Sequence, residues 1–234
     1  MNELIPALLR GLWITVQATF GAFALACALG LILAILRRAR IKWVSVPMVW
    51  LIEFIRTTPL VVQAVFMWMA LPRLIGMPLS ALTVGILSLG LHYSAYLSEV
   101  YRSGIEGVPR GQWEAAVALN FSPAQKWLRI ILPQAIPPVL PVMGNYLIVM
   151  FKEVPVLMAI TLGEMLLAAN SYIASTFADG IVPYSLVALF FLAVSYPSSL
   201  LVRLMERRLN RQRGTQYGNR IRNRRSRIRG ERTV

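Results

Sequence analysis

Residues 11–36 contain no charged side chain, and this run constrains the fold more than any other feature of the chain. A helix over these 26 residues is about 39 Å long, enough to cross a hydrocarbon core about 30 Å thick. The alternative is a signal peptide, whose apolar region has only about 7–15 residues and precedes a polar mature chain. This run is longer and is followed by more apolar sequence, so we predict a membrane-spanning helix.

Small side chains recur every four residues along this predicted helix. They are Ala18, Ala22, Ala26 and Gly30. A ridge of small residues lets a second helix approach closely. The alternative is that Ala and Gly are simply frequent here, and the sequence does not decide between the two interpretations.

Four more apolar stretches follow along the chain. They lie at about 47–71, 80–101, 136–160 and 184–202. The first three contain ionisable side chains but remain long enough to span a membrane. We therefore predict an all-α integral membrane protein with five transmembrane helices.

The connecting segments alternate between rich and poor in Lys and Arg. Loop 37–46 has four such residues and loop 72–79 has one, whereas segment 102–133 has four and segment 161–183 has none. Residues 203–234 then contain 12 Arg. Because cytoplasmic loops carry the excess of Lys and Arg, the alternation predicts an outside N-terminus and a cytoplasmic C-terminus.

The formal net charge of +14 is concentrated in the same C-terminal tail. Residues 203–234 carry 12 Arg and 2 Glu, which gives +10 of the total. A basic nucleic-acid-binding domain would be far less apolar than a chain that is 57% hydrophobic, so we expect no nucleic acid as a partner. We predict that residues 209–234 form a disordered cytoplasmic tail, which either contacts anionic membrane lipid or only marks the cytoplasmic side.

The remaining side chains exclude several classes of enzyme. The chain has one histidine, His92, and one cysteine, Cys27, which excludes a His/Cys zinc site and an internal disulfide. It also lacks a phosphate-binding P-loop of its own. We therefore expect no catalytic residues, no metal site and no cofactor in this chain.

Segment 102–135 is too long for a tight turn and contains helical signals of its own. We predict a helix over 112–119, ended by Asn120 in the left-handed conformation, which Asn tolerates well. Ser122, followed by a proline, is a typical helix start, and we expect this second helix to cover 124–132 and to stop at Pro133. Two short cytoplasmic helices could form a knob for a partner protein or be an ordinary connector.

This segment resembles the EAA loop of permease subunits of bacterial ABC importers. The residues at the corresponding positions, which we take as the candidate coupling residues, are Gly111, Glu114, Ala115, Ala116, Asn120, Ile130, Leu132 and Pro133. Further blocks resemble the polar amino-acid uptake branch of that family, at 52–60 with Gln63, at 95–102 and at 111–113. The resemblance covers about residues 8–208, and we take 1–208 as the permease domain with a coupling loop at 106–133.

The resemblance implies a membrane subunit whose chemistry is done by partners. It implies a pair of ATP-binding subunits that the coupling loop contacts, a second permease subunit, identical or homologous, and an extracytoplasmic solute-binding protein. It also implies a multi-pass protein of the bacterial cytoplasmic (inner) membrane. From the residues alone, the alternative is a stand-alone ion-coupled transporter or channel in which Glu53, His92 and Glu99 couple protons.

The chain departs from the family pattern at two places. Asn120 stands where the family usually has Gly, and 153–157 replace the Thr-Ser-Leu run of the amino-acid branch. The resulting Lys-Glu-x-Pro sequence is similar to that of permeases for ectoine and hydroxyectoine. We therefore expect a small polar or zwitterionic solute, either an amino acid or a compatible solute such as these.

Ionisable side chains within a span cost about 2.5–3.5 kcal/mol each on insertion scales, so they usually face protein or a water-filled path. The candidate residues for a solute path are Glu53, Arg56, Gln63, Asn145, Lys152 and Glu153. The alternative is that these charges pair internally and fix helix packing, as the spacing of three residues allows for Glu53 with Arg56. For His92 and for Glu99 with Arg102 we favour packing roles.

Two acidic residues border the outer segment. Glu164 and Asp179 lie within the predicted loop 161–183, which has no Lys or Arg. This loop could receive a solute-donating protein. A simply solvated surface is an equally good interpretation.

Overall fold

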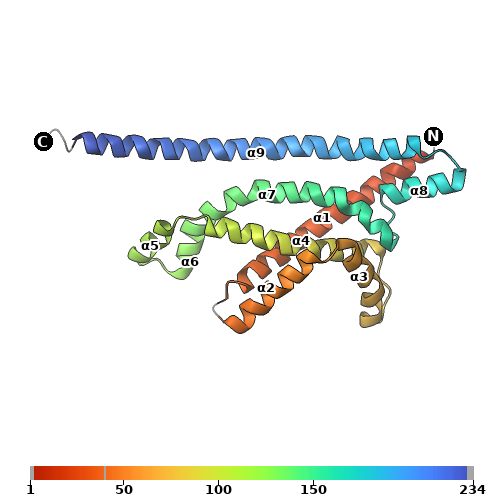
Figure 1. Cartoon of the computed structure of the whole chain (residues 1–234), viewed down its shortest axis with the longest axis horizontal. Helices are drawn as coiled ribbons and strands as arrows, with labels where there is room; N and C mark the ends of the chain where they lie inside the picture. Colours follow the sequence, from red (N-terminus) through yellow and green to blue (C-terminus); the bar gives the residue numbers. More distant parts are fainter. Residues whose placement is uncertain (1–2, 40, 231–234) are drawn as a thin grey trace.

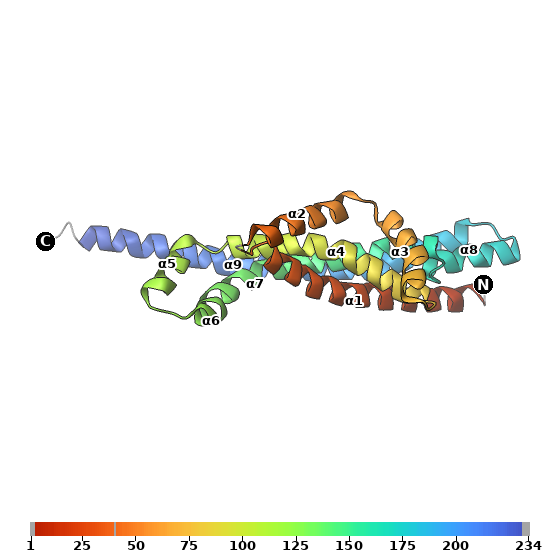
Figure 2. The same ribbon diagram turned by 90° about the horizontal axis from the view of Figure 1, so that it is seen from below.

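The computed structural model describes residues 3–39 and 41–230, with side chains described up to residue 209. Every regular element in these residues is a helix, as the apolar runs predict. Four helical segments are long and apolar enough to cross a membrane, and a sharply bent pair of helices is a fifth candidate. The chain is elongated in both views, and α5 and α6 lie at the end opposite to α8 (Figures 1 and 2).

Helix α1 (Leu4–Leu36) begins earlier than the uncharged run. Leu4 and Leu8 are buried against Met165 and Val187, so apolar packing stabilises the turns before residue 11. The ridge of small residues is confirmed as a packing surface, since all four of its members are buried. A β-carbon on Gly30 would lie 2.9 Å from the carbonyl oxygen of Ser94, which shows how closely this helix approaches α4.

The predicted span 47–71 is broken into α2 (Lys42–Thr57) and α3 (Leu60–Ile75), which meet at 105°. Pro59 lies at the break. Its nitrogen carries no hydrogen, and the residue before a proline is disfavoured in a helical conformation. Thr58 is accordingly extended, with φ −93° and ψ 138°. The proline therefore ends α2 and starts α3.

Helix α4 (Ala81–Glu106) is the centre of the molecule and contacts α1, α2, α3 and α7. Ser80 caps its start, where the side chain accepts a hydrogen bond from the backbone N–H of Thr83. One face of α4 packs with α1 and the end of α7 into the largest apolar core, around Leu89 and Leu97. Polar side chains on α4 therefore lie close to every helix that surrounds it.

Segment 102–135 forms α5 (Arg110–Ala118), α6 (Pro123–Gln125) and the π-helix η1 (Lys126–Ile131) between α4 and α7. Two local predictions are confirmed: Asn120 has φ 53°, and Ser122 caps the second helix. Gln125 completes a capping box, which the sequence reading did not include.

The prediction that this second helix stops at Pro133 is wrong. The chain continues directly into α7 (Leu132–Glu153), so that residue lies in the first turn of a longer helix. The N–H of Leu132 donates to the carbonyl oxygen of Trp127, five residues earlier. This wider π turn gives the proline ring room that a regular α-helix would deny it.

The last part of the chain forms the 3₁₀-helix η2 (Val154–Ile160), α8 (Met165–Thr176) and α9 (Ile181–Gly230). Helix α9 packs along α7 and α8. Its backbone is helical as far as Gly230 (Figure 1). Disorder of the tail 209–234 stays a prediction, and residues 231–234 lie outside the described residues.

Candidate functional site

Three tyrosines from two helices form an aromatic cluster beside the α2–α3 break. Tyr93 and Tyr96 come from α4 and Tyr146 comes from α7, and their ring centroids are 5.7–6.0 Å apart. Tyr93 and Tyr96 are three residues apart, which puts them on one face of a helix. The hydroxyl of Tyr93 donates to Oε2 of Glu153 at 2.7 Å, which gives the cluster one anionic neighbour.

A cationic side chain lies at another side of the same cluster. The guanidinium carbon of Arg56 is 5.3 Å from the ring centroid of Tyr96, in cation–π geometry. The Tyr96 hydroxyl donates to the Arg56 carbonyl oxygen at 3.4 Å. Nε of Arg56 is buried and has no hydrogen-bond partner among the described residues. The tyrosine cluster, defined as Tyr93, Tyr96 and Tyr146, is therefore bordered by one cation and one anion.

Gln63 secures the break between α2 and α3. Its Nε2 donates to the carbonyl oxygens of Ile55, at 2.8 Å, and Thr58, at 3.2 Å, and to Oγ1 of Thr58 at 2.6 Å. Its Oε1 lies 3.2 Å from Nδ1 of His92 on α4. His92 is 7% exposed, and its ring packs against Tyr93 and Tyr96.

Glu99 connects three helices near the end of α4. Its carboxylate forms ion pairs with Arg37 of α1 and with Arg102, where Nε is 2.7 Å from Oε2, and it lies 3.9 Å from Arg56 of α2. Glu106 extends this group through Arg102 and, at 3.8 Å, through Arg38. The predicted pairing of Glu99 with Arg102 is confirmed, but the carboxylate serves more partners than the helical spacing indicated.

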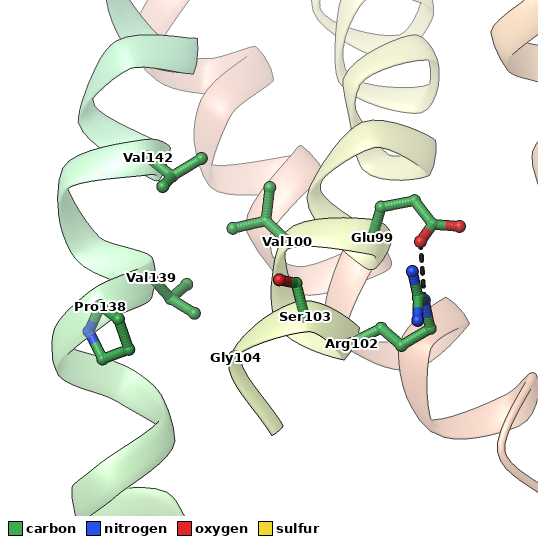
Figure 3. A pocket seen from close by; sticks show the side chains of 8 residues that line it. All are labelled: Glu99, Val100, Arg102, Ser103, Gly104, Pro138, Val139 and Val142. Atoms are coloured by element: carbon green, nitrogen blue, oxygen red, sulfur yellow. Dashed lines mark hydrogen bonds and ion pairs between the residues drawn. The ribbon is translucent and has the colours of Figure 1, made fainter. Parts of the chain in front are cut away.

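A crevice of about 290 Å³ lies beside this ion-pair group, between α4 and α7. Figure 3 shows Val139 and Val142 of α7 facing Val100 and Ser103 of α4, with the Glu99–Arg102 pair at the edge. The lining is mostly apolar. We assign no ligand to this crevice.

The structure brings together only part of the predicted solute path. Arg56, Gln63 and Glu153 reach the tyrosine cluster or His92 next to it. Glu53 is exposed and pairs with Arg56 at 3.5 Å, as its spacing predicts.

Two members of the predicted path lie elsewhere. Asn145 is exposed, and its Nδ2 lies 3.4 Å from Glu206 of α9. Lys152 is also exposed and is in no ion pair within the described part of the chain. Lys152 and Glu153 are adjacent on α7 and therefore point in different directions, as their spacing implies. The tyrosines were not among the residues predicted from sequence, although Tyr96 lies four residues after His92 and therefore shares its helix face.

The coupling element, defined as α5, α6 and η1, is folded around a small apolar core. Val108, Ile131 and Ala135 are buried in it, and the rings of Trp113 and Trp127 meet edge to face with centroids 5.4 Å apart. This core explains why so short a segment keeps a defined shape. It attaches the element to the end of α4 and to the start of α7.

The predicted coupling residues divide between this core and the outer surface. Gly111, Glu114, Ala115, Asn120 and Pro133 are exposed, Ile130 and Leu132 are half-buried, and Ala116 is 2% exposed. The outer surface also carries exposed apolar side chains, with Val117 at 62% and Leu119 at 67%. A surface hollow of about 440 Å³ is lined by Trp113, Glu114, Val117 and Ala118.

One interpretation of segment 161–183 was a simply solvated surface. For Glu164 this interpretation is wrong. Its side chain is fully buried, and it caps α8 by accepting from the backbone N–H groups of Leu166, at 2.8 Å, and Leu167, at 2.7 Å. Burial raises the pKa of this carboxyl group, and the two N–H donors oppose that rise. A β-carbon on Gly11 would lie 2.8 Å from Met165, so α1 covers the cap closely.

Comparison with known proteins agrees with this architecture. A probable amino-acid ABC transporter permease, y4tG of Sinorhizobium fredii (strain NBRC 101917 / NGR234), is 47% identical over 204 residues, 87% of each chain. A probable glutamine ABC transporter permease, GlnM of Bacillus subtilis (strain 168), is 34% identical and matches 86% of this chain and 92% of its own.

Solved structures show the same fold. One is described as an amino acid ABC transporter with histidines; it is 33% identical, has a TM-score of 0.81 and matches 89% of this chain and 96% of its own. The MetNI methionine ABC transporter in an inward-facing conformation has a TM-score of 0.72 at 17% identity, over 88% of this chain and 99% of its own, and this supports the fold alone.

The matching family model, described as "Binding-protein-dependent transport system inner membrane component", covers residues 4–211. Members of this family that match the chain over most of its length are permease subunits, and ATP hydrolysis is the work of a separate subunit. The chain belongs to the family of binding-protein-dependent transport system inner membrane components and is a permease subunit of an ABC importer.

Proposed function

We propose that this permease carries an amino acid or a similar small zwitterion past the tyrosine cluster. The observation that carries the proposal is the placement of Arg56 and Glu153 at two sides of the three tyrosines. A zwitterion has one carboxylate and one cationic group. Arg56 suits the carboxylate, whereas Glu153 and the tyrosine rings suit the cation.

The bent pair α2–α3 supports a path at this place. Non-helical backbone at membrane depth occurs where it is buried in protein or lines a water-filled cavity. The break at Thr58 and Pro59 lies next to Arg56 and is lined by side-chain hydrogen bonds from Gln63. With α2 and α3 counted as one span, the chain crosses the membrane five times.

We place α5 and α6 on the cytoplasmic side and α8 outside. The Lys- and Arg-rich segment 102–133 and the C-terminal end of α9 lie toward one end of the molecule, and segment 161–183 lies toward the other (Figure 1). This arrangement fits the positive-inside rule, with an outside N-terminus in the cytoplasmic membrane of a bacterium. The segment around α8 then faces an extracytoplasmic solute-binding protein.

The coupling element is the contact for the ATP-binding subunit in this proposal. Val117 and Leu119 are exposed apolar side chains, and Val117 lines a hollow together with Glu114, which is a surface suited to a protein partner. A single permease chain would be paired with a second copy or a homologue, and two ATP-binding subunits would complete the transporter.

Reconstitution tests this function directly. The permease would be placed in proteoliposomes with its ATP-binding subunit and its solute-binding protein, and uptake of labelled solute would be measured with ATP and with ion gradients. We expect uptake that needs both ATP and the solute-binding protein. Uptake driven by an ion gradient alone, without the ATP-binding subunit, would contradict the proposal and favour a stand-alone carrier.

The same assay addresses the solute. Labelled L-arginine, L-glutamine, L-cystine, ectoine and hydroxyectoine would be compared. The first three are included because three relatives are named for the transport of arginine, glutamine and cystine. We expect an amino acid or one of the two compatible solutes to be taken up, because each carries both charges. An unlabelled neutral polyol should compete poorly with the labelled solute. If it inhibits uptake as well as the zwitterions do, the proposed path at Arg56 and Glu153 is contradicted.

A further inference from the structure

The α2–α3 corner leaves a backbone acceptor without its helical donor. In a continuous helix the N–H of residue 59 would donate to the carbonyl oxygen of Ile55, four residues earlier, but Pro59 has no N–H. Nε2 of Gln63 takes that place at 2.8 Å. The same nitrogen also reaches the carbonyl oxygen of Thr58, so one side-chain amide from α3 satisfies two backbone carbonyls at the end of α2.

These contacts determine which way the Gln63 amide points. Both carbonyl oxygens can only accept a hydrogen bond, so the nitrogen of the amide must face them and its oxygen must face His92. Oε1 is itself only an acceptor and lies 3.2 Å from Nδ1 of His92. Nδ1 therefore carries the hydrogen, which is true of one neutral tautomer and of the charged ring alike.

We infer that His92 is a positioning residue, whose Nδ1–H holds the Gln63 amide on the open carbonyls of the α2–α3 corner and so keeps Arg56 beside the tyrosine cluster. His92 is buried, so water does not readily replace its hydrogen bond. Arg56 lies three residues before Pro59, its guanidinium lies over Tyr96, and a change in the corner displaces it. The role in transport rests on the proposed solute path, whereas the role in the corner does not.

Three substitutions of His92 separate this role from simple packing. His92→Asn keeps a donor nitrogen two bonds from the β-carbon, the same reach as Nδ1 of the imidazole ring. His92→Gln moves its donor one bond further away, and His92→Leu removes the donor altogether. If the ring serves only to fill space, Leu and Gln replace it better than the smaller Asn does.

Hydrogen exchange of the assembled transporter in lipid nanodiscs reads the corner without reference to the solute. We expect peptides that cover 54–66 to exchange faster in His92→Gln and His92→Leu, about tenfold for the loss of one buried hydrogen bond, and to be restored in His92→Asn. Peptides from α8 and α9 in the same samples are the internal control. Unchanged exchange in His92→Gln and His92→Leu, or faster exchange in His92→Asn alone, would overturn the inference.

Uptake of the labelled amino acids and ectoines extends the test to transport. We expect the KM of the solute carried by the wild type to rise about tenfold in His92→Gln and His92→Leu, with kcat changed far less, and to return toward the wild-type value in His92→Asn. Adding His92→Leu to Gln63→Leu should change either readout little further, because the amide that His92 holds is already absent. Fully additive effects would contradict it.

The two parts can fail separately. Absence of ATP-driven uptake by the wild type would contradict the proposed function and leave the exchange result to decide the role of His92. Normal uptake by the wild type together with an unaltered corner in His92→Leu would contradict the positioning role alone.

Discussion

The coupling element and the tyrosine cluster are built in opposite ways. The coupling element takes its shape from short-range signals, such as Asn120 in the left-handed conformation and the Ser122 cap, and it exposes apolar side chains outward. The tyrosine cluster is assembled from α4 and α7, and it contacts Arg56 of α2 and Glu153 of α7. This contrast underlies our proposal that the first is a surface for a partner and that the second is an interior that a small solute meets.

The largest expected effect comes from reversing the charge on the coupling element. Glu114 is exposed beside the surface hollow, so Glu114→Arg should leave the fold intact but oppose docking of the ATP-binding subunit. We expect co-purification of that subunit and ATP-driven uptake to fall by at least about thirtyfold, as for loss of an interface hot spot of about 2 kcal/mol or more.

The matched control is Arg73→Glu, an exposed charge reversal near the end of α3. Co-purification of the ATP-binding subunit at the wild-type level with Glu114→Arg would show that α5 is not the docking surface. Equal losses from both variants would show a general effect of charge reversal.

The tyrosine cluster should respond in transport and not in assembly. Glu153→Gln removes the anion that accepts from Tyr93, and we expect KM for a zwitterion to rise by at least about tenfold, as for loss of a charged hydrogen bond. Tyr93→Phe removes the same hydrogen bond but keeps the charge, so its effect should be smaller. Lys152→Met, which changes the neighbouring exposed residue, should also reduce uptake if the path extends to it.

In all three variants the ATP-binding subunit should co-purify normally. Loss of that subunit from Glu153→Gln would remove the distinction between the two regions. Unchanged KM in Glu153→Gln would place the solute elsewhere.

The ion pairs of Glu99 should matter more for stability than an exposed pair of the same kind. Glu99→Gln leaves Arg37 and Arg102 without their common acceptor, at a position where the Glu99 side chain is 24% exposed. We expect a loss of about 1–2 kcal/mol in unfolding free energy, less than for a fully buried pair because water still reaches the group. Thermal unfolding in detergent measures it.

Glu53→Gln is the control for this prediction. It breaks the Glu53–Arg56 pair, in which the carboxylate side chain is 59% exposed. Its effect should be no more than a few tenths of a kcal/mol, as for other exposed pairs. Equal losses from the two variants would contradict the greater weight given to Glu99.

Sequence reasoning succeeded where the determining contacts are local in the chain. The helical class, the left-handed conformation of Asn120 and the Ser122 cap each depend on a few neighbouring residues. The prediction failed at Pro133, because a π turn immediately before it removes the steric reason for a helix to stop.

The candidate site was predicted only in part because its contacts are distant in sequence. Tyr93 and Glu153 are 60 residues apart, and Gln63 and His92 are 29 apart. A single sequence indicates that Glu153 needs a partner at membrane depth but does not say which one. Burial of Glu164 was missed for the same reason, since the covering residue, Gly11, belongs to a helix far away in the chain.

Glu164 predicts a pH dependence that the two main regions should not share. Its pKa in the folded protein is raised above the ordinary value of 4.5, so folding favours the protonated form. Its contribution to stability is therefore fully present below pH 4.5 and is lost as pH rises through the raised pKa, by about 1.4 kcal/mol for each unit of the rise.

Glu164→Gln should remove this slope, since the amide does not titrate. Thermal unfolding between pH 4 and 8 compares it with the wild type, and Asp179→Asn is the control because that carboxylate is exposed. If the stability of the wild type instead rises with pH, and Glu164→Gln abolishes that rise, the sign given for the pKa shift of Glu164 is wrong.

The smallest effect is expected from the basic tail, which belongs to neither region. Residues 212–234 follow the apolar part of α9 and lie beyond the 4–211 segment that matches the family. If transport depends only on the tyrosine cluster and the coupling element, deletion of 212–234 should change ATP-driven uptake by less than about twofold, which is within about 0.4 kcal/mol. Membrane insertion should also persist, because loop 37–46 and segment 102–133 still carry the cytoplasmic charge. If uptake falls strongly while insertion and co-purification of the ATP-binding subunit stay normal, the tail is a third functional region. Binding of the deleted and full-length proteins to anionic vesicles would then show whether lipid is its partner.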